Sequence, residues 1–382
     1  MNTLFVLRFD RPEEAERRIA GAAVAAHLAA AAGLAGGRDI RIAIAGALPL
    51  SSPAWDDVHR ACPFARLGGS EAGSGLSISG RFLVSGESLL RFLESEAHTL
   101  LWRGEAVAVR AGAAGGTFVL ASDEVVRCDD EREAARWVLK GTEKPTDGVV
   151  SRRLNRPISQ AISRQLLMID SIRPWQMTLV TAGIAVVMVV ALLTRTYGGL
   201  IAGGLLFHLA SVIDGVDGEI ARATYRSSAR GAAFDTTVDM ATNLSFYLGF
   251  TFAMTRLYGP RVTLLSGASF LLALVGLAMM VWLARRTGAP GSFDFLKRYY
   301  REKCPTGLPR MIIDSFITLM SRDTFAFVWA LFILFRRPLL IAYGFAFFAL
   351  LWVILILIAA PALLRVRPLT ATGALALGSG AP

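Results

Sequence analysis

The sequence contains few cysteines and histidines, and this limits the kinds of site it can form. The chain has 382 residues, with 3 cysteines and 4 histidines. Cys62, Cys128 and Cys304 lie far apart and form no Cys-x-x-Cys pair. A disulfide framework needs more cysteines, and a structural zinc site needs closely spaced ligands, so neither is expected.

Charged residues are also scarce. They make up 18% of the chain, whereas hydrophobic residues make up 54%, and the mean hydropathy is +0.49. This composition excludes an ordinary soluble enzyme along the whole length. Residues 1–150 mix charged and apolar segments, but long apolar runs recur from about Met177 onward. We therefore expect a soluble domain followed by a membrane domain.

Two further absences concern location and partners. Met1–Phe9 leads directly into acidic sequence without a basic segment and a long apolar run, so no secretory signal is expected. The formal net charge is +10, but the Arg and Lys residues are spread along the chain, many beside apolar runs. This pattern excludes a nucleic-acid footprint and favours a multi-pass protein of the inner (plasma) membrane with its N-terminal domain in the cytoplasm.

The first 143 residues have the pattern of an α/β domain. Thr3–Phe9 reads as a strand, Pro12–Leu34 as one long Ala-rich helix and Asp39–Ala45 as a second strand. Later segments read as further strands and helices: Arg81–Ser85 and Thr117–Leu120 as strands, Glu87–Glu96 and Asp130–Leu139 as helices. This alternation predicts a Rossmann-like layer domain.

The domain resembles a sugar-nucleotide or polyol-phosphate nucleotidyltransferase. Such domains carry a Gly-rich, basic loop after the first strand, which holds the nucleotide phosphates. Here Phe9–Glu13 contains no glycine and two acids. Gly68–Gly80 is rich in glycine but contains no lysine, and we interpret it as a flexible loop. We therefore expect the domain to be inactive.

Residues 144–173 are predicted to form a linker and a juxtamembrane amphipathic helix, Ile158–Met168. Six membrane spans are expected in residues 174–366, at about 175–194, 199–222, 233–256, 262–284, 311–335 and 338–362. Asp314 and Ser321–Asp323 interrupt the fifth span, so a surface helix followed by a shorter span is the alternative there. Residues 367–382 are expected to be a flexible tail.

Basic residues indicate the orientation of the spans and also leave a question open. The connection 285–310 and the Arg222–Arg230 turn are rich in Arg and Lys, so both are expected on the cytoplasmic side. The basic residues of 285–310 either anchor the protein or bind a phosphate of a substrate. For Arg152, Arg153 and Arg156, anchoring to headgroups is the favoured interpretation.

Four aspartates stand in apolar sequence between residues 214 and 239. Asp214 and Asp217 are three residues apart, and Asp235 and Asp239 are four apart, so each pair lies on one face of its own helix. An acid costs roughly 2.5–3.5 kcal/mol at the centre of a membrane helix, so four are tolerated only near the interface or when bound cations neutralise them. Carboxylates suit two divalent cations, Mg²⁺ or Mn²⁺.

The complete pattern is Asp214-x2-Asp217-Gly218-x2-Ala221-Arg222-x8-Gly231-x3-Asp235-x3-Asp239. It is similar at every fixed position to the signature of the CDP-alcohol phosphotransferase family, and the resemblance extends over about 151–365. Within the family, the SRRLNRPIS junction and the preceding domain most resemble the branch of di-inositol-phosphate-phosphate synthases and phosphatidylinositol-phosphate synthases.

The resemblance implies roles for these residues. Asp214, Asp217 and Asp235 would bind the two cations, and Asp239 would contact the second cation or act as general base. The residues Gly218, Ala221, Arg222 and Gly231 would shape the CDP site. The partners would be a CDP-alcohol donor and an alcohol acceptor, at least one of them a lipid, together with membrane lipids, and a homodimer is expected. The products would be a phospholipid or polar lipid and CMP.

Two alternatives remain open at this point. A cation transporter or channel would also place acids in a membrane, but it would distribute them across the bilayer, whereas these lie at one end beside glycine and arginine. The transferase interpretation is therefore favoured. The donor is either CDP-diacylglycerol or a soluble CDP-polyol.

Overall fold

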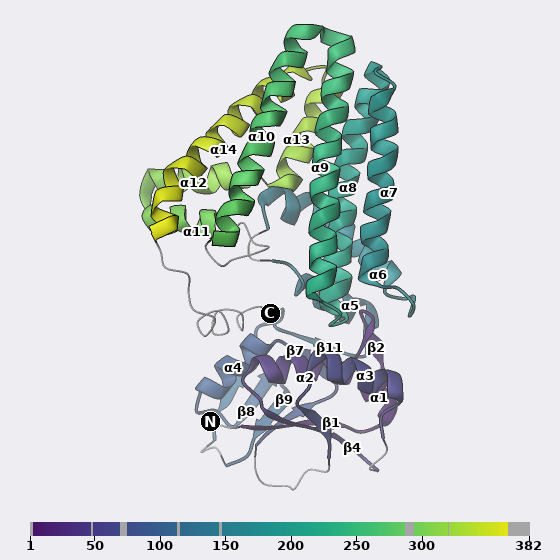
Figure 1. Cartoon of the computed structure of the whole chain (residues 1–382). Coiled ribbons are helices and arrows are strands. Elements are labelled where there is room, and N and C mark those ends of the chain that lie inside the picture. The colour runs from purple at the N-terminus through teal and green to yellow at the C-terminus, as the bar shows by residue number, and fades with distance from the viewer. Residues whose placement is uncertain are drawn as a thin grey trace. The chain divides into compact units, whose positions relative to one another are not determined.

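The computed structural model describes residues 3–46, 49–68, 75–112, 115–144, 147–286, 294–319 and 321–365. The predicted tail, 367–382, lies outside these ranges. The chain divides into two compact units (Figure 1). The first contains Met1–Lys144, Gln160–Pro174 and Val216–Ser228, and the second contains Pro145–Ser159, Trp175–Gly215 and Ala229–Pro382.

The first unit contains a seven-stranded sheet within the described residues, in the order β10-β8-β9-β6-β1-β4-β5. Its strands are β1 (Leu4–Phe9), β4 (Asp39–Ile44), β5 (Ala65–Leu67), β6 (Leu76–Ser79), β8 (Thr99–Trp102), β9 (Glu105–Arg110) and β10 (Thr117–Val119). Strand β1 runs parallel to both β4 and β6, and β9 runs antiparallel to β6 and β8. Phe5 and Leu7 of β1 are fully buried, as a central strand requires. The predicted α/β class is confirmed.

Helices and a small second sheet complete this unit. The helices are α3 (Ser52–Ala61), α4 (Gly86–Glu94) and α5 (Glu131–Lys140), and β7 (Phe82–Val84) pairs with β11 (Val125–Arg127). Ser85 caps α4 by accepting a hydrogen bond from the Ser88 backbone N–H at 3.0 Å. Asp130 caps α5 in the same way, at 3.0 Å from the Glu133 N–H. These caps explain why both helices begin close to where the sequence predicts.

The prediction of one helix over Pro12–Leu34 was wrong. Helix α1 (Pro12–Glu16) ends early, the short strands β2 (Arg18–Ile19) and β3 (Ala22–Ala23) pair, and α2 (Val24–Leu34) follows. Ala20 and Gly21 take positive φ angles of 49° and 79°. A Cβ atom at Gly21 would lie 2.7 Å from Leu167 Cδ2, so close packing against residue 167 overrides the helical propensity of the alanines.

The interpretation of Gly68–Gly80 as a flexible loop was also wrong in part. Its last residues form β6, which lies between β1 and β9 in the sheet. Leu76 and Ile78 are fully buried, and Ser77 and Ser79 alternate with them. This alternation extends over only four residues and follows a run of glycines, so the sequence does not reveal the strand.

The second unit is helical, and its long helices lie side by side (Figure 1). The helical segment of the chain comprises a π-helical turn (Ser151–Asn155), α6 (Arg156–Leu166), α7 (Pro174–Leu193), α8 (Tyr197–Ala223), α9 (Ala229–Tyr258), α10 (Pro260–Arg286), α11 (Asp294–Lys303), α12 (Gly307–Leu319), α13 (Arg322–Leu334) and α14 (Leu339–Arg365). Phe207 and Phe246 stack at 4.1 Å between ring centroids in the core of the second unit. Bulky apolar side chains therefore hold α8 and α9 together.

Four helices of the described residues are long and apolar enough to cross a membrane: α7, α8, α10 and α14. The six expected spans are therefore not confirmed. The third falls within α9, a 30-residue helix whose polar residues, among them Asp239 and Asn243, lower its hydropathy. The fifth, 311–335, was wrong as a single helix, because it is divided between α12 and α13. Each has 13 residues, about 20 Å of helix, which is short for a bilayer.

Candidate functional site

The acidic stretch lies on two consecutive helices. Asp214 and Asp217 are on α8, and Asp235 and Asp239 are on α9. The helices are joined by residues 224–228, where Tyr225 takes a positive φ of 56°. The short connection reverses the chain, so the end of α8 and the beginning of α9 carry acids at the same end of the pair.

Three of the acids form a compact group. Asp214, Asp217 and Asp235 each offer a carboxylate oxygen, and these oxygens all lie within 4.8 Å of one another. Asp217 is only 6% exposed. Three negative charges this close repel strongly in a poorly solvated place unless a cation lies between them.

Asp239 is held differently. Its carboxylate forms an ion pair with Nη1 of Arg322, the first residue of α13. The same Nη1 lies 3.2 Å from the Asp214 carboxylate. The Arg322 side chain is 12% exposed, so it is a buried cation shared between one acid of each helix. In the sequence, Arg322 stands out only as an interruption of an apolar segment, so its ion pairs with Asp214 and Asp239 were not predicted.

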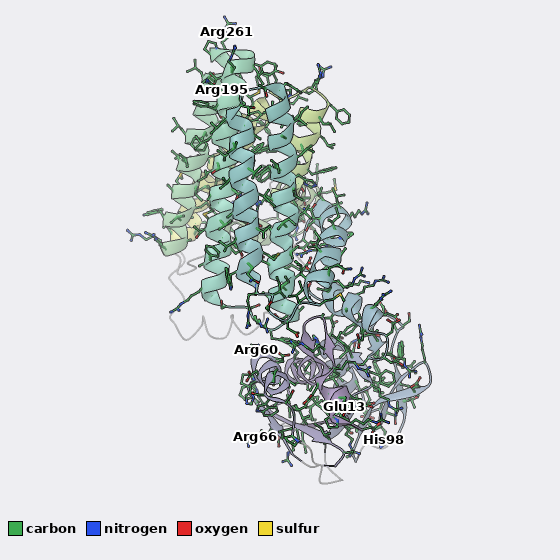
Figure 2. The ribbon with its side chains drawn as sticks, turned by 90° about the vertical axis from the view of Figure 1, so that its right-hand side faces the viewer. Glu13, Arg60, Arg66, His98, Arg195 and Arg261 are labelled. Carbon is green, nitrogen blue, oxygen red and sulfur yellow. The ribbon has the colours of Figure 1, made fainter. Side chains whose placement is uncertain are left out.

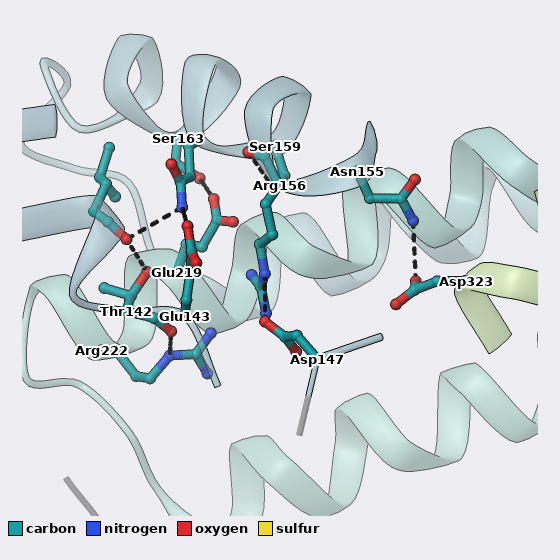
Figure 3. A network of polar contacts seen from close by, with 12 residues as sticks. Thr142, Glu143, Asp147, Asn155, Arg156, Ser159, Ser163, Glu219, Arg222 and Asp323 are labelled. Carbon is teal, nitrogen blue, oxygen red and sulfur yellow. Dashed lines mark hydrogen bonds and ion pairs between the residues drawn. The ribbon is translucent and has the colours of Figure 1, made fainter. Parts of the chain in front are cut away.

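A second network fixes the beginning of α13. Asp323 accepts hydrogen bonds from Asn155 Nδ2 at 3.0 Å and from Ser211 Oγ at 2.7 Å. Figure 3 shows the bond between Asn155 and Asp323. Ser211 lies one turn before Asp214 on α8, so Asp323 links α13 to the helix that carries the acids. This contact positions the neighbouring Arg322.

Arg222 and Gly218 are close together on the last turns of α8. A Cβ atom at Gly218 would lie 2.9 Å from Arg222 Nη1, so the glycine lets the guanidinium rest against the helix. Arg222 Nε donates to the backbone oxygen of Thr142 at 2.8 Å (Figure 3). Ala221 is half-buried, and Gly231 is exposed on the first turn of α9. Gly218, Ala221 and Gly231 thus bring no bulky side chain to these turns of α8 and α9.

Glu219 lies between these residues and is fully buried. Ser163 of α6 donates a hydrogen bond to its carboxylate at 2.5 Å (Figure 3). Gln160, also on α6, donates to Glu143 at 3.0 Å. Helix α6 therefore contacts both the end of the α/β fold and the last turns of α8, all within the first unit.

A buried histidine contacts the connection after α8. The His27 Nε2 atom is 2.8 Å from the carbonyl oxygen of Ile19, which accepts only, so Nε2 carries the proton. His27 Nδ1 therefore accepts from the Tyr225 hydroxyl at 2.9 Å. Burial lowers the pKa of His27 below its ordinary value, although the Ile19 carbonyl and Asp57 oppose the shift. Burial also raises the pKa of Tyr225, so the pair is neutral.

The structure corrects one prediction for the basic residues. Arg156, interpreted as a headgroup anchor, is buried and pairs with Asp147 at 2.9 Å, so it does not face headgroups (Figure 3). In the basic connection, Arg301 and Arg310 both pair with Asp314, at 3.2 Å and 2.5 Å. Residues 287–293 of that connection lie outside the described ranges.

The donor set fits a divalent cation. Carboxylate oxygens are hard ligands, and Asp214, Asp217 and Asp235 bring three of them into one small volume. These side chains would hold a divalent cation, which would supply positive charge for phosphate oxygens. Asp239 lies beside this group and is held by Arg322 instead.

Comparison with known proteins identifies the family. The model of the CDP-alcohol phosphatidyltransferase family matches residues 172–364, half of the chain. The chain is similar to a protein of Thermococcus kodakarensis named bifunctional IPC transferase and DIPP synthase, at 37% identity over 132 residues, 35% of this chain and 28% of the relative. A protein of Rubrobacter xylanophilus with the same name is 38% identical over 170 residues, 42% of this chain and 37% of the relative. The matches thus span little more than a third of these relatives' length at most. The resemblance expected from the motif is confirmed, and the chain belongs to the CDP-alcohol phosphatidyltransferase family.

Proposed function

We propose that the protein is a membrane-embedded transferase that moves a substituted phosphate group from a CDP-alcohol to an acceptor alcohol and releases CMP. The observation that carries the proposal is the grouping of Asp214, Asp217 and Asp235 within 4.8 Å, on the motif that defines the family. A cation pathway would need acids at several depths of the membrane, whereas these three come from adjoining ends of α8 and α9.

The proposed reaction needs little covalent work from the protein. Asp214, Asp217 and Asp235 would hold the divalent cations, which would supply positive charge against the diphosphate of the donor. Asp239 accepts the proton of the acceptor hydroxyl. The hydroxyl oxygen then forms a bond to the phosphorus that carries the donor alcohol, and the bond from that phosphorus to the CMP oxygen breaks. Positioning and charge stabilisation supply most of the rate.

The remaining motif residues and Arg322 have supporting roles in this proposal. Arg222 supplies a fixed cation for donor phosphate, and Gly218, Ala221 and Gly231 leave room for the CDP group. Arg322 pairs with Asp239 and orients its carboxylate until the acceptor arrives. The π-helical turn and Asn155 act on Arg322 through Asp323.

The alcohols are proposed by class only. The donor is CDP-diacylglycerol or a CDP-polyol, the acceptor is an alcohol, and at least one of them is a lipid, so the reaction belongs to phospholipid or polar-lipid synthesis. Relatives named as bifunctional transferases and synthases support an alcohol-phosphate chemistry of this kind. We further propose a homodimer in the inner membrane with the site on the cytoplasmic side, in keeping with the basic connections.

Release of CMP tests the proposal. Purified protein supplied with a CDP-alcohol, an acceptor and Mg²⁺ should release CMP, and chelation of the metal should stop the release. Asp239→Asn should abolish release from a protein that still folds, as cooperative thermal unfolding shows, whereas the matched variant Asp314→Asn, at an exposed acid outside the site, should retain it. Unimpaired turnover by Asp239→Asn would remove Asp239 as the base.

A further inference from the structure

Four arginines from separate parts of the first unit gather around the segment that leads into α7. Arg18 belongs to β2 and Arg60 to α3, while Arg173 precedes α7 and Arg226 follows α8. None of the four is a fixed position of the motif, although Arg226 lies in the gap between Arg222 and Gly231. We call the four the arginine cluster.

Ion pairs and a hydrogen bond bring three of these arginines to one place. Arg18 lies 3.2 Å from Asp57 and, through Nε, 3.2 Å from Asp170. Arg60 also pairs with Asp57. Arg226 Nη1 donates to the carbonyl oxygen of Ile172 at 3.1 Å. Arg18 and Arg226 therefore both contact the segment 170–173, which carries Arg173 itself.

The acids around the cluster do not balance its charge. Asp57 is buried and is already engaged by Arg18, Arg60 and the Ala23 N–H at 3.2 Å. Asp170 is 83% exposed, so its pairing with Arg18 is weakened by solvent. These two carboxylates pair with Arg18 and Arg60, and within the part of the chain that the structure describes no carboxylate pairs with Arg226, which is left as a local excess of positive charge.

Arg226 is the arginine of the cluster that this excess of positive charge destabilises. Its Nε is buried and has no hydrogen-bond partner among the described residues. Burial lowers the pKa of Arg226 below its ordinary value, and the charges of Arg173, Arg60 and Arg18 lower it further. A buried donor without a partner and a cation surrounded by cations are both relieved by a bound anion. Guanidinium groups suit phosphate because they donate paired hydrogen bonds to its oxygens.

The neighbouring sequence places the cluster at the level of membrane headgroups. Arg173 directly precedes Pro174, the first residue of the candidate span α7, and Arg226 follows the end of the candidate span α8. Consecutive antiparallel spans put these two positions on the same side of the bilayer. Met168 and Ile169 are 79% and 51% exposed, as apolar residues inserted between headgroups would be.

We propose that the arginine cluster is a binding site for the phosphate of an anionic lipid headgroup. The phosphate lies against Arg226 and is shared with Arg60, Arg18 and Arg173, and the acyl chains extend beside α7. A lipid bound here joins the α/β fold, through Arg18 and Arg60, to the connection after α8. The site is separate from the acids of the motif and does not depend on the proposed reaction.

The test is a lipid titration of the full-length protein in a neutral detergent, followed by native mass spectrometry. Phosphatidylglycerol should bind about tenfold more tightly than phosphatidylcholine, because only its phosphate remains uncompensated by a headgroup cation. The double variant Arg60→Gln/Arg226→Gln should lose about tenfold of the phosphatidylglycerol affinity. Arg66→Gln is the matched control, since Arg66 is an exposed arginine of the same unit far from Arg60 (Figure 2).

Three results would overturn the proposal. The first is equal affinity for the two lipids, and the second is an equal loss of phosphatidylglycerol affinity in Arg66→Gln. The third is displacement of phosphatidylglycerol by inorganic phosphate at equal concentration, which would show a site for a soluble anion. The melting temperature without lipid checks that the variants fold. If the double variant unfolds, the single variant Arg226→Gln replaces it. The salt dependence of wild-type binding is then measured as well, and added KCl should weaken the binding of phosphatidylglycerol but not that of phosphatidylcholine.

Discussion

Arg322 shows how one buried cation connects helices that are distant in sequence. Its guanidinium contacts Asp214 of α8 and Asp239 of α9, so it compensates part of the negative charge at the site. A divalent cation bound by Asp214, Asp217 and Asp235 would compensate the same charge. The stability of the metal-free protein and its response to Mg²⁺ should therefore both depend on Arg322.

Arg322→Gln should lower the melting temperature of the metal-free protein and enlarge the increase that Mg²⁺ produces. The loss should fall below the roughly 3–5 kcal/mol of a fully buried pair, because the two carboxylates are about a quarter exposed. Added Mg²⁺ then stabilises the variant more, since no protein cation competes for Asp214. Thermal unfolding with chelator and with Mg²⁺ measures both effects. Arg310→Gln, which breaks an exposed pair with Asp314, should change neither by much; an unchanged Mg²⁺ response in Arg322→Gln would contradict this account.

His27 should make the stability of the protein depend on pH. Burial depresses the pKa of His27 in the folded state, so its contribution to stability is complete above the unfolded value of about 6.5 and is lost as pH falls towards the folded pKa. A second proton on Nδ1 would also displace the bond that the Tyr225 hydroxyl donates.

Melting temperatures measured between about pH 7.5 and pH 5 test this expectation. The wild-type protein should lose stability across that range, and His27→Gln should flatten the loss, because the amide has no proton to gain. His59→Gln is the control, since His59 is exposed on α3 against Trp55. Equal pH slopes in wild type and His27→Gln would show that His27 does not titrate as described.

At the scale of elements, the last turns of α8 are held by α6. The Ser163 hydroxyl is fully buried and donates to the fully buried Glu219 carboxylate. Ser163→Ala should cost about 1–3 kcal/mol, since it leaves a buried carboxylate with one donor fewer. Because Glu219 lies between Gly218 and Arg222, the KM for the CDP-alcohol should rise more than kcat falls.

Steady-state CMP release and thermal unfolding measure the two effects of Ser163→Ala. Ser171→Ala removes an exposed hydroxyl from the connection after α6 and should leave both unchanged. A fall in kcat at constant KM would indicate that α6 acts on the chemical step and not on the donor site.

The sequence predicts elements well where the information is local. The acids at spacings of three and four fall on one face of α8 and one face of α9, and helical periodicity alone requires this. Arg322 is 83 residues from Asp239, so no periodicity connects them. The sequence signal was the charged pair Arg322 and Asp323 in an apolar segment. Charges in a membrane segment cost free energy, so they are usually retained for a function. The same pair marks the position where the expected fifth span divides into α12 and α13.

Other errors arose where tertiary contacts decide local structure. The Ala-rich segment 12–34 has a high helical propensity throughout, yet residues 17–23 turn because they pack against residues 57, 167 and 224. Strand β6 has only four residues after a run of glycines, and its partners β1 and β9 make it a strand. Neither β1 nor β9 is adjacent to it in sequence, so a local pattern does not reveal the pairing.

At the scale of the whole molecule, the α/β unit carries acids at the place where a nucleotidyltransferase binds the phosphates of its nucleotide. The connection after β1 leads into α1, whose first turn carries Glu13 and Glu14. The Asp10 N–H donates to the Glu14 carboxylate at 3.2 Å, so the protein's own acid occupies the positive end of this helix. A pocket of about 450 Å³ at the ends of β1 and β6 is lined by Asp10, Glu14 and Glu105 as well as by Arg8 and Arg81. These acids oppose the binding of a nucleoside triphosphate where such folds usually bind phosphates.

The full-length protein should therefore release no pyrophosphate from CTP and an alcohol phosphate, while the same preparation releases CMP from a preformed CDP-alcohol. Asp10 and Glu14 place two negative charges where the triphosphate would need donors, and repulsion between like charges disfavours the complex. Pyrophosphate and CMP are measured in parallel, so CMP release shows that the preparation is folded and active. Pyrophosphate formation that copurifies with the protein, and that Asp10→Ala abolishes, would show that the α/β unit is an active nucleotidyltransferase and that its acids bind a metal ion instead of excluding the nucleotide.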